Sequence, residues 1–414
     1  MTQSLNRRAF LSRSAMIGCS LAASPLVTPL SFAATPGENR LVVILLRGGM
    51  DGLGVVRPYG DPAYRALRGD GGLSEPNGAV DLDGYFALHP GLRPLLPLWD
   101  KGQLGFAHAV STPYRDQRSH FDGQDLLEAG LSDLNNGTSR DGWLNRALQH
   151  LPNGQTDTAY AIGRDQLSVL SGRAEVQRWS PEADLVLSPQ AIKLAGLIMQ
   201  DDPLFDAAFQ KAMAISDSDG DAVATTGSLD DLMQELNNSR KQSSGKNRTT
   251  LEQRIAEFAG KRLREDTRIA SFSINGWDTH QNQGRALHIA LNRLSNAILT
   301  LQETMRGPVW NKTTVVAVTE FGRTAKINGT GGTDHGTGGL MVMAGGALRG
   351  GRVMADWPGL DESELYGRRD LMPTRDVRAY LGWLLHNQFG LTKSAIETSV
   401  FPGVDLGADP KLIR

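Results

Sequence analysis

Cysteine is almost absent from this chain of 414 residues, which has a single one, Cys19. Cys19 lies in an N-terminal segment that we expect to be removed, so the mature protein would have no thiol. A chain without thiols forms no disulfide and no thiolate metal site. Any bound metal ion would therefore be held by imidazole nitrogens and by oxygens of Asp, Glu, Asn or hydroxyl groups.

An excess of positive charge is also lacking, since 43 Lys and Arg stand against 45 Asp and Glu, for a net charge of −2. This balance does not suggest nucleic acid as a partner, because proteins that bind nucleic acid usually carry a basic patch. No G-x-G-x-x-G is present in "LRGGMDGLG", and Asp51 there would repel a pyrophosphate. A nucleotide-binding oxidoreductase is therefore a weak alternative.

Residues 1–33 are predicted to be an export signal rather than folded structure. Arg7 and Arg8 are followed by Phe10, Leu11 and a moderately apolar run, which ends in a small-x-small cleavage pattern at 31–33. This pattern resembles a twin-arginine signal, so the twin-arginine translocase is the predicted partner during export. One alternative is an ordinary secretory signal. The other is a lipid-attachment site at Cys19, and the short apolar run before Cys19 disfavours this second alternative. Past the signal, no stretch reaches the apolar length of a membrane span, and we expect a periplasmic or secreted protein without stable membrane insertion.

Short apolar runs alternate with helical patterns along the rest of the chain. The runs occupy 41–46, 104–110, 158–163, 269–274, 313–319 and 340–346, and the clearest helical patterns occupy 249–266 and 286–305. Such alternation predicts an α/β fold with a mostly parallel sheet. We expect 34–414 to form this domain, with the polar segment 214–248 as a mobile insertion.

Acids and histidines gather where the predicted strands end. In parallel α/β sheets, ligands bind outside the carboxyl ends of the strands. Three of the predicted strands are followed by a carboxylate, and a fourth is preceded by an acid and a histidine within a run of glycines. The residues are Asp51, Asp278, His280, Glu320, Asp334 and His335.

Each of these residues has a structural alternative when it is taken alone. Asp51 could cap a turn, Asp278 could cap a helix beside an exposed His280, and Glu320 could pair with Arg323 on the surface. Their coincidence at one edge of the sheet favours a shared site. Carboxylates and imidazoles without sulfur suit Zn²⁺, Mn²⁺ or Mg²⁺. We expect one or two such ions, because clustered carboxylates without a cation would raise each other's pKa.

Four motifs together carry a resemblance to a known family. The stretches "LVVILLRGGMDGL", "RSHFDGQDLLEAG", "GWDTHQNQ" and "TEFGRTAKINGTGGTDHGTGGLMVMAGG" resemble the DUF1501 family of exported bacterial proteins. That family looks like a branch of the alkaline phosphatase–sulfatase superfamily. The resemblance implies a three-layer α/β/α fold with a central, mostly parallel sheet, and the ancestry of a metal-assisted hydrolase.

The resemblance also implies roles for single residues. Asp51 matches the first metal-binding acid and Asp278 the acid of a later Asp–His pair, although His280 stands closer to it than is usual. His335 matches the last metal-binding histidine, with Asp334 as a further ligand or as the residue that orients His335. Phe321, next to Glu320, stands where an imidazole ligand is expected.

The nucleophile is left open between two serines. The superfamily places it at a helix N-terminus, where the helix dipole favours an anion. Ser119 could open such a helix, with Arg118 beside it for the anion, and Ser111 is the second choice. The structural alternatives are a helix cap for Ser119 and a turn for Ser111. His120 could be a metal ligand, could hold the leaving group or could be a surface histidine.

Two functions follow from this pattern. The first is a metal-dependent hydrolase of phosphate or sulfate esters, in which Ser119 or a water attacks and Arg118 or Arg323 holds the anion. The second is a non-catalytic metal-binding or anion-binding assembly protein on a degenerate hydrolase fold. The second function predicts binding of a metal ion or an anion without turnover of any ester.

Overall fold

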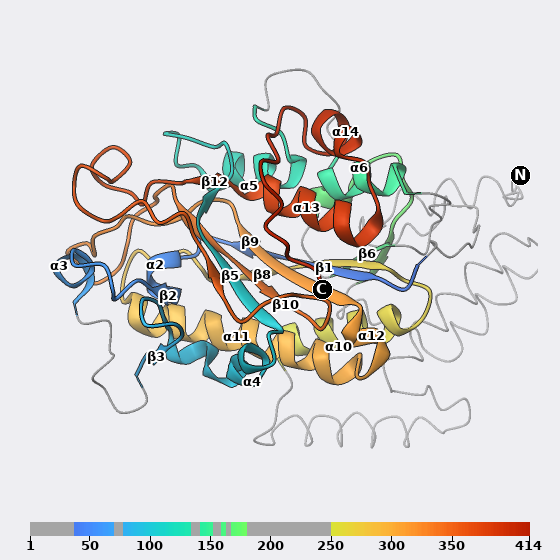
Figure 1. The fold of residues 1–414 in the computed structure, drawn as a ribbon, viewed down its shortest axis with the longest axis horizontal. Helices are drawn as coiled ribbons and strands as arrows, with labels where there is room; N and C mark the ends of the chain where they lie inside the picture. Colours follow the sequence, from blue (N-terminus) through green and yellow to red (C-terminus); the bar gives the residue numbers. More distant parts are fainter. Residues whose placement is uncertain (1–36, 70–77, 134–140, 152–158, 163–166, 180–249) are drawn as a thin grey trace, which may run out of the picture. The chain divides into compact units, whose positions relative to one another are not determined.

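The computed structural model describes residues 37–69, 78–133, 141–151, 159–162, 167–179 and 250–414 (Figure 1). The predicted signal at 1–33 and the predicted insertion at 214–248 lie outside the described residues. The prediction that 34–414 forms one domain stays a prediction. None of the described helices combines the length and the apolar character that crossing a membrane requires.

A mixed sheet of nine strands forms the centre of the described part of the chain. Its order is β11-β5-β10-β9-β1-β8-β6-β7, with β12 paired to β5. Only β10 runs against the others, since both of its pairings are antiparallel and the remaining pairings are parallel. The strands are β1(Arg40–Arg47), β5(Leu104–Ser111), β6(Ala159–Ile162), β7(Gln177–Trp179), β8(Ile269–Asn275), β9(Thr313–Thr319), β10(Gly339–Ala344), β11(Val353–Met354) and β12(Arg375–Asp376).

The continuous apolar run at 41–46 forms β1, which lies between β8 and β9. Every one of these six residues is buried, because helices cover both faces of a parallel sheet and leave no face to solvent. The other predicted runs also become strands, so the expectation of an α/β fold with a mostly parallel sheet is confirmed.

Helices cover the sheet on both sides, which gives three layers (Figure 1). One layer contains α10(Leu251–Arg264), α11(Gln283–Thr304), the 3₁₀ helix η1(Pro90–Leu95) and α4(Leu96–Asp100). The other contains α5(His120–Ala129), α6(Trp143–Gln149) and α13(Val377–Phe389). Alternate β1 residues, Leu41, Val43 and Leu45, share one apolar cluster with Trp143 of α6 and Trp383 of α13. The predicted three-layer α/β/α class is therefore confirmed.

A small second sheet follows β1 along the chain. It consists of β2(Val56–Arg57), β4(Ala87–Leu88) and β3(Val80–Asp81), paired in that order. Along the chain, the short helix α2(Gly52–Val55) lies between β1 and β2, and α3(Tyr64–Arg68) lies between β2 and β3. The remaining short helices are η3(Ser168–Leu170), α12(Pro308–Asn311), α14(Lys393–Ala395) and the π-helical turn η4(Ile396–Val400).

The carboxyl ends of β1, β8 and β9 lie side by side. Leu46 pairs with Thr319 of β9, and Arg47 pairs with Asn275 of β8. Because β10 is antiparallel, its first residue lies at this same edge. The segments 48–51, 276–280 and 320–324 leave the sheet here, and the segment 333–338 enters it. This placement brings the predicted site residues to one edge.

Candidate metal centre

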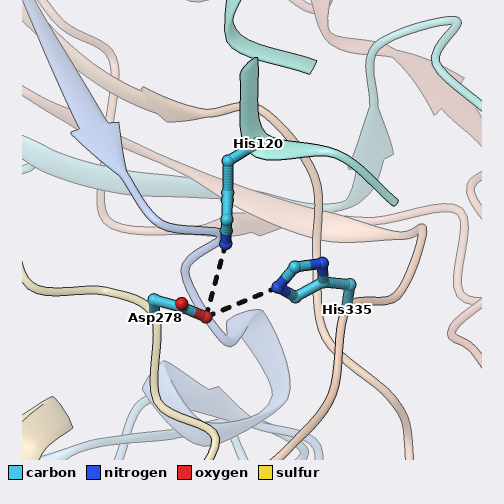
Figure 2. A group of neighbouring side chains, drawn as sticks. All are labelled: His120, Asp278 and His335. Atoms are coloured by element: carbon cyan, nitrogen blue, oxygen red, sulfur yellow. Dashed lines mark ion pairs between the residues drawn. The ribbon is translucent and has the colours of Figure 1, made fainter. Parts of the chain in front are cut away.

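Three imidazoles and one carboxylate converge at this edge. Figure 2 shows His120, Asp278 and His335 pointing toward one another, and one ligand atom from each lies within 4.8 Å of the others. The Nε2 atoms of His120 and His335 are 3.4 and 3.5 Å from Asp278 Oδ1. His280 joins them, since its Nε2 is 3.0 Å from the same oxygen and 3.0 Å from His335 Nε2.

The other nitrogen of each imidazole faces an oxygen. His120 Nδ1 is 2.8 Å from Glu320 Oε1, and His280 Nδ1 is 3.0 Å from Asp334 Oδ1. His335 Nδ1 is 2.7 Å from the carbonyl oxygen of Arg118. An ionised carboxylate or a carbonyl can only accept, so these contacts place the hydrogen on Nδ1 and, in the neutral ring, the lone pair on Nε2.

These lone pairs need a positive charge between them. In the neutral rings, His280 Nε2 and His335 Nε2 would face each other as two acceptors at 3.0 Å, beside the acceptor Asp278 Oδ1. His120 Nε2 is buried, and within the described residues it has no hydrogen-bond partner. A divalent cation satisfies all four atoms, and oxygen partners on Nδ1 are the usual second contact of metal-binding histidines. The donor set therefore fits a metal ion.

Protons compete for the same atoms. The hydrogen bond from His120 to Glu320, and the charges of Glu320 and Asp278, raise the pKa of His120 above its usual value. Burial lowers the pKa of His335. Burial would raise the pKa of Asp278, but Arg323 together with His120 and His280 holds that pKa below normal. Because ligands must be deprotonated, acid would release a bound metal.

Glu320 lies behind His120 rather than at the point of convergence. It is 1% exposed, and its Oε1 accepts hydrogen bonds from His120 Nδ1, Gly48 N and Gln124 Nε2, while Oε2 accepts from Thr319 Oγ1. Burial would raise the pKa of Glu320, but these donors keep it below normal. In this arrangement Glu320 orients an imidazole.

Asp334 has the corresponding place behind His280. The structure pairs it with His280, whereas the resemblance implied a further metal ligand or the residue that orients His335. Its Oδ1 also accepts from Asn328 Nδ2 at 3.2 Å. The hydrogen bond from His280 is the first cause of its lowered pKa.

Asp51 does not join the group formed by His120, Asp278 and His335. Its Oδ2 accepts from Arg68 Nη1 at 2.6 Å, and its Oδ1 accepts from Arg68 Nη2 at 3.0 Å. Gln283 Nε2 donates a third hydrogen bond to Oδ2. Burial would raise the pKa of Asp51, but Arg68 together with Gln283 and Arg323 lowers it. The metal role expected for Asp51 stays a prediction, and in the structure its partners are an arginine and an amide.

Arg323 is buried, and its guanidinium donates to five acceptors of the protein. It donates to Asp278 Oδ1 at 2.5 Å and to the carbonyls of Gly48, Gly49, Trp277 and Thr333. These acceptors belong to segments that follow β1 and β8 and that precede β10. The guanidinium therefore ties the segments together instead of forming the surface pair with Glu320 considered above, and its contacts leave it poorly placed to hold a substrate anion.

The two candidate nucleophiles have structural partners. Ser119 is the N-cap of α5, where its Oγ accepts from Asp122 N at 3.4 Å. Ser111 ends β5, is buried and donates to the carbonyl of Thr112. Among the described hydrogen bonds, none joins either hydroxyl to one of the three imidazoles. Arg118 contributes its backbone carbonyl to His335, and its side chain is exposed.

The aromatic ring of Phe321 lines one side of the candidate metal centre. Its ring stacks on His120 at 5.0 Å between centroids and lies 4.9 Å from His335. The sequence suggested Phe321 only as the loss of an imidazole, whereas the third imidazole here is His120.

Sequence reasoning missed Gln124, Gln283 and Arg68, because no spacing or motif marks a residue that acts on the site through a hydrogen bond.

Comparisons with known proteins give one family. The family model described as "Protein of unknown function (DUF1501)" matches residues 100–397. No curated protein matches the chain.

Several solved structures are similar at low sequence identity. The alkaline phosphatase from the Antarctic bacterium TAB5 is 12% identical, with a TM-score of 0.32 over 76% of this chain and 92% of that one. The zinc complex of the C-terminal periplasmic domain of EcEptC from Escherichia coli is 9% identical, with a TM-score of 0.34 over 93% and 96%. The lipoteichoic acid synthase LtaP from Listeria monocytogenes is 8% identical, with a TM-score of 0.28, and the match spans 69% of this chain and 56% of that one. Likenesses of this size do not transfer an activity.

Proposed function

This chain belongs to the DUF1501 family, and we propose that it is an exported, metal-dependent hydrolase of phosphate or sulfate esters. One observation carries the proposal, namely the convergence of three imidazole Nε2 atoms on Asp278 Oδ1 while each Nδ1 is held by an oxygen. The twin-arginine motif at Arg7 and Arg8 supports passage through the twin-arginine translocase to the periplasm or beyond.

His120, His280, His335 and Asp278 would hold the ion. Imidazole-rich sets favour Zn²⁺, and Mn²⁺ ranks next here, whereas Mg²⁺ prefers oxygen ligands alone. When bound, such an ion supplies a Lewis acid for an ester oxygen and lowers the pKa of a water or hydroxyl. The Asp278 side chain is 47% exposed, so the centre is open to a substrate on that side.

The surrounding residues have separate tasks. Glu320, Asp334 and the Arg118 carbonyl fix the tautomer and direction of the three rings. Phe321 keeps water from one side of His120. The exposed Arg118 side chain supplies the positive charge for an anionic ester, because the Arg323 N–H groups are already engaged. The attacking group is a water or Ser119, whose hydroxyl oxygen accepts the cap bond from Asp122 N.

The test is hydrolysis of p-nitrophenyl phosphate, bis-p-nitrophenyl phosphate and p-nitrophenyl sulfate by full-length protein loaded with Zn²⁺ or Mn²⁺. Turnover is expected to disappear on treatment with a chelator, to return with metal, and to be lost in His335→Ala. The matched control is His150→Ala, which removes a histidine that contacts Ser399 elsewhere on the molecule. Ser119→Ala separates the two attacking groups, since a water mechanism would survive it. Turnover that persists in His335→Ala would refute the proposal.

A second function has its own support. Asp51 is engaged by Arg68, Ser119 caps a helix, and Phe321 stands where an imidazole was expected, so the same centre could bind metal without catalysis. A metal- or anion-binding assembly protein predicts stoichiometric metal that depends on His335, with no turnover of any ester in the same assays. Multiple turnover of one ester would exclude it.

A further inference from the structure

We infer that the centre takes one metal ion, and that the guanidinium of Arg68 occupies the place at Asp51 that a second cation would fill. Asp51 then helps to position the two segments that carry metal ligands, 276–280 and 333–338, through a hydrogen bond with the side-chain amide of Gln283. We call these two the ligand-bearing segments. The inference rests on the metal centre of the proposed function, but it needs no catalysis.

The Asp51–Arg68 pair is complete without a metal. The two side chains are 1% and 3% exposed, and each oxygen of Asp51 faces a different Arg68 nitrogen. Arg68 also donates to the carbonyls of Ala325 and Thr324, which hold it in place. A metal at Asp51 would displace this guanidinium and leave its charge buried without the opposing carboxylate, which is costly.

Gln283 connects Asp51 with two ligand-bearing segments. Its Nε2 donates to Asp51 Oδ2, which forces its Oε1 to face away from Asp51. That Oε1 accepts hydrogen bonds from Thr279 Oγ1 at 2.8 Å and from Thr333 Oγ1 at 2.5 Å.

The two threonines lie next to the metal-site residues. Thr279 is between Asp278 and His280, and Thr333 directly precedes Asp334 and His335. Thr333 N also donates to the carbonyl of Thr279 at 3.1 Å, so the two segments are tied to each other as well as to Gln283. The fixed carboxylate of Asp51 thus sets the orientation of one amide, and that amide sets the spacing of both segments.

Gln283 and Asp51 are accordingly positioning residues. Loss of either bond would loosen the approach of His280 and His335 without removing a ligand. Loss of outer contacts of this kind typically weakens metal affinity about 10- to 100-fold. The number of ions bound and the identity of the ligand atoms would stay the same.

The experiment is a titration of chelator-treated, full-length protein with Co²⁺, followed by calorimetry and by the visible d–d bands. Wild type is expected to bind one equivalent. Asp51→Asn and Gln283→Met are also expected to bind one equivalent, with unchanged band positions and affinity roughly tenfold weaker. His335→Ala should shift the bands, because it removes a ligand. Gln149→Met is the matched control, since Gln149 bonds Asn145 and Asp141 away from the centre.

Two equivalents in wild type, one of them lost in Asp51→Asn, would overturn the inference and leave the proposed hydrolase standing. A band shift in Asp51→Asn would also overturn it, because it would make Asp51 a ligand. Absence of any bound cobalt would overturn both this inference and the metal centre. One equivalent without ester hydrolysis would support the inference while the hydrolase proposal fails. If Asp51→Asn does not fold, wild type and Gln283→Met decide the matter.

Discussion

His89 is a buried imidazole at the start of η1, and it links folding stability to pH. Its Nδ1 accepts a hydrogen bond from Gly91 N, and the residue is 5% exposed. Burial, together with the charge of Arg57, lowers the pKa of His89 to about 3. In the unfolded chain the pKa of a histidine is about 6.5. As pH falls below that value, the unfolded chain takes up a proton that the folded protein does not, so stability declines toward acid.

His89→Asn removes this titration while keeping an oxygen that can cap η1, because Asn is a favoured N-cap residue. We expect the free energy of unfolding of wild type, relative to His89→Asn, to fall by about 2 kcal/mol between pH 8 and pH 5. Urea unfolding of both proteins at these two pH values measures the difference. A difference that does not change with pH would show that His89 protonates equally in both states.

At the scale of elements, the segment between β9 and β10 owes its path to glycine. An added Cβ on Gly332 would lie 2.2 Å from the backbone of His280, and one on Gly322 would lie 1.8 Å from the carbonyl oxygen of Gly338. The first approach brings the His280 segment against the segment that carries His335, and the second brings residue 322 against residue 338. Packing against neighbouring backbone therefore explains Gly332, Gly336 and Gly338 in the run beside Asp334 and His335, whereas Gly331 has a positive φ of 71°.

Gly332→Ala is expected to push the His280 segment away from His335. Metal affinity should fall by at least about tenfold, and stability should fall by roughly 1–3 kcal/mol, as for other overpacked sites. Gly329→Ala is the control in the same segment, since a Cβ there would meet nothing within 4 Å. Calorimetric metal titration and thermal unfolding compare the two variants. Equal behaviour of the two would contradict the steric argument.

How far the sequence could predict this site depends on the element considered. Apolar runs predicted β1, β8, β9 and β10, and the rule that ligands bind at strand ends placed Asp278, His280 and His335 at one edge. The sequence could not separate ligands from orienting residues, because that depends on side-chain direction. Glu320, for example, follows β9 as a ligand would, yet its carboxylate is taken up by Gly48 N and His120. The partnership of Asp51 with Arg68 depends on the path of α2 and α3, which no periodicity indicates.

At the scale of the whole molecule, the residues of the centre come from segments far apart in the chain. His120 opens α5, Asp278 and His280 follow β8, and His335 precedes β10. A bound ion therefore joins the α5 side of the fold to the ends of two strands. Since the described contacts at the centre place acceptor atoms against one another, we expect a bound ion to relieve their repulsion and to stabilise the folded state.

Free metal at about 100 times its dissociation constant should add roughly 2.7 kcal/mol to the free energy of unfolding. For a chain of this size that corresponds to a rise in Tm of roughly 3 °C. Differential scanning calorimetry of chelator-treated protein, with and without Zn²⁺, measures this rise. His335→Ala should lose most of it, because one imidazole is missing, whereas His150→Ala should respond as wild type does. An equal rise in His335→Ala would locate the stabilising metal elsewhere in the molecule, and the assignment of the centre would then be wrong.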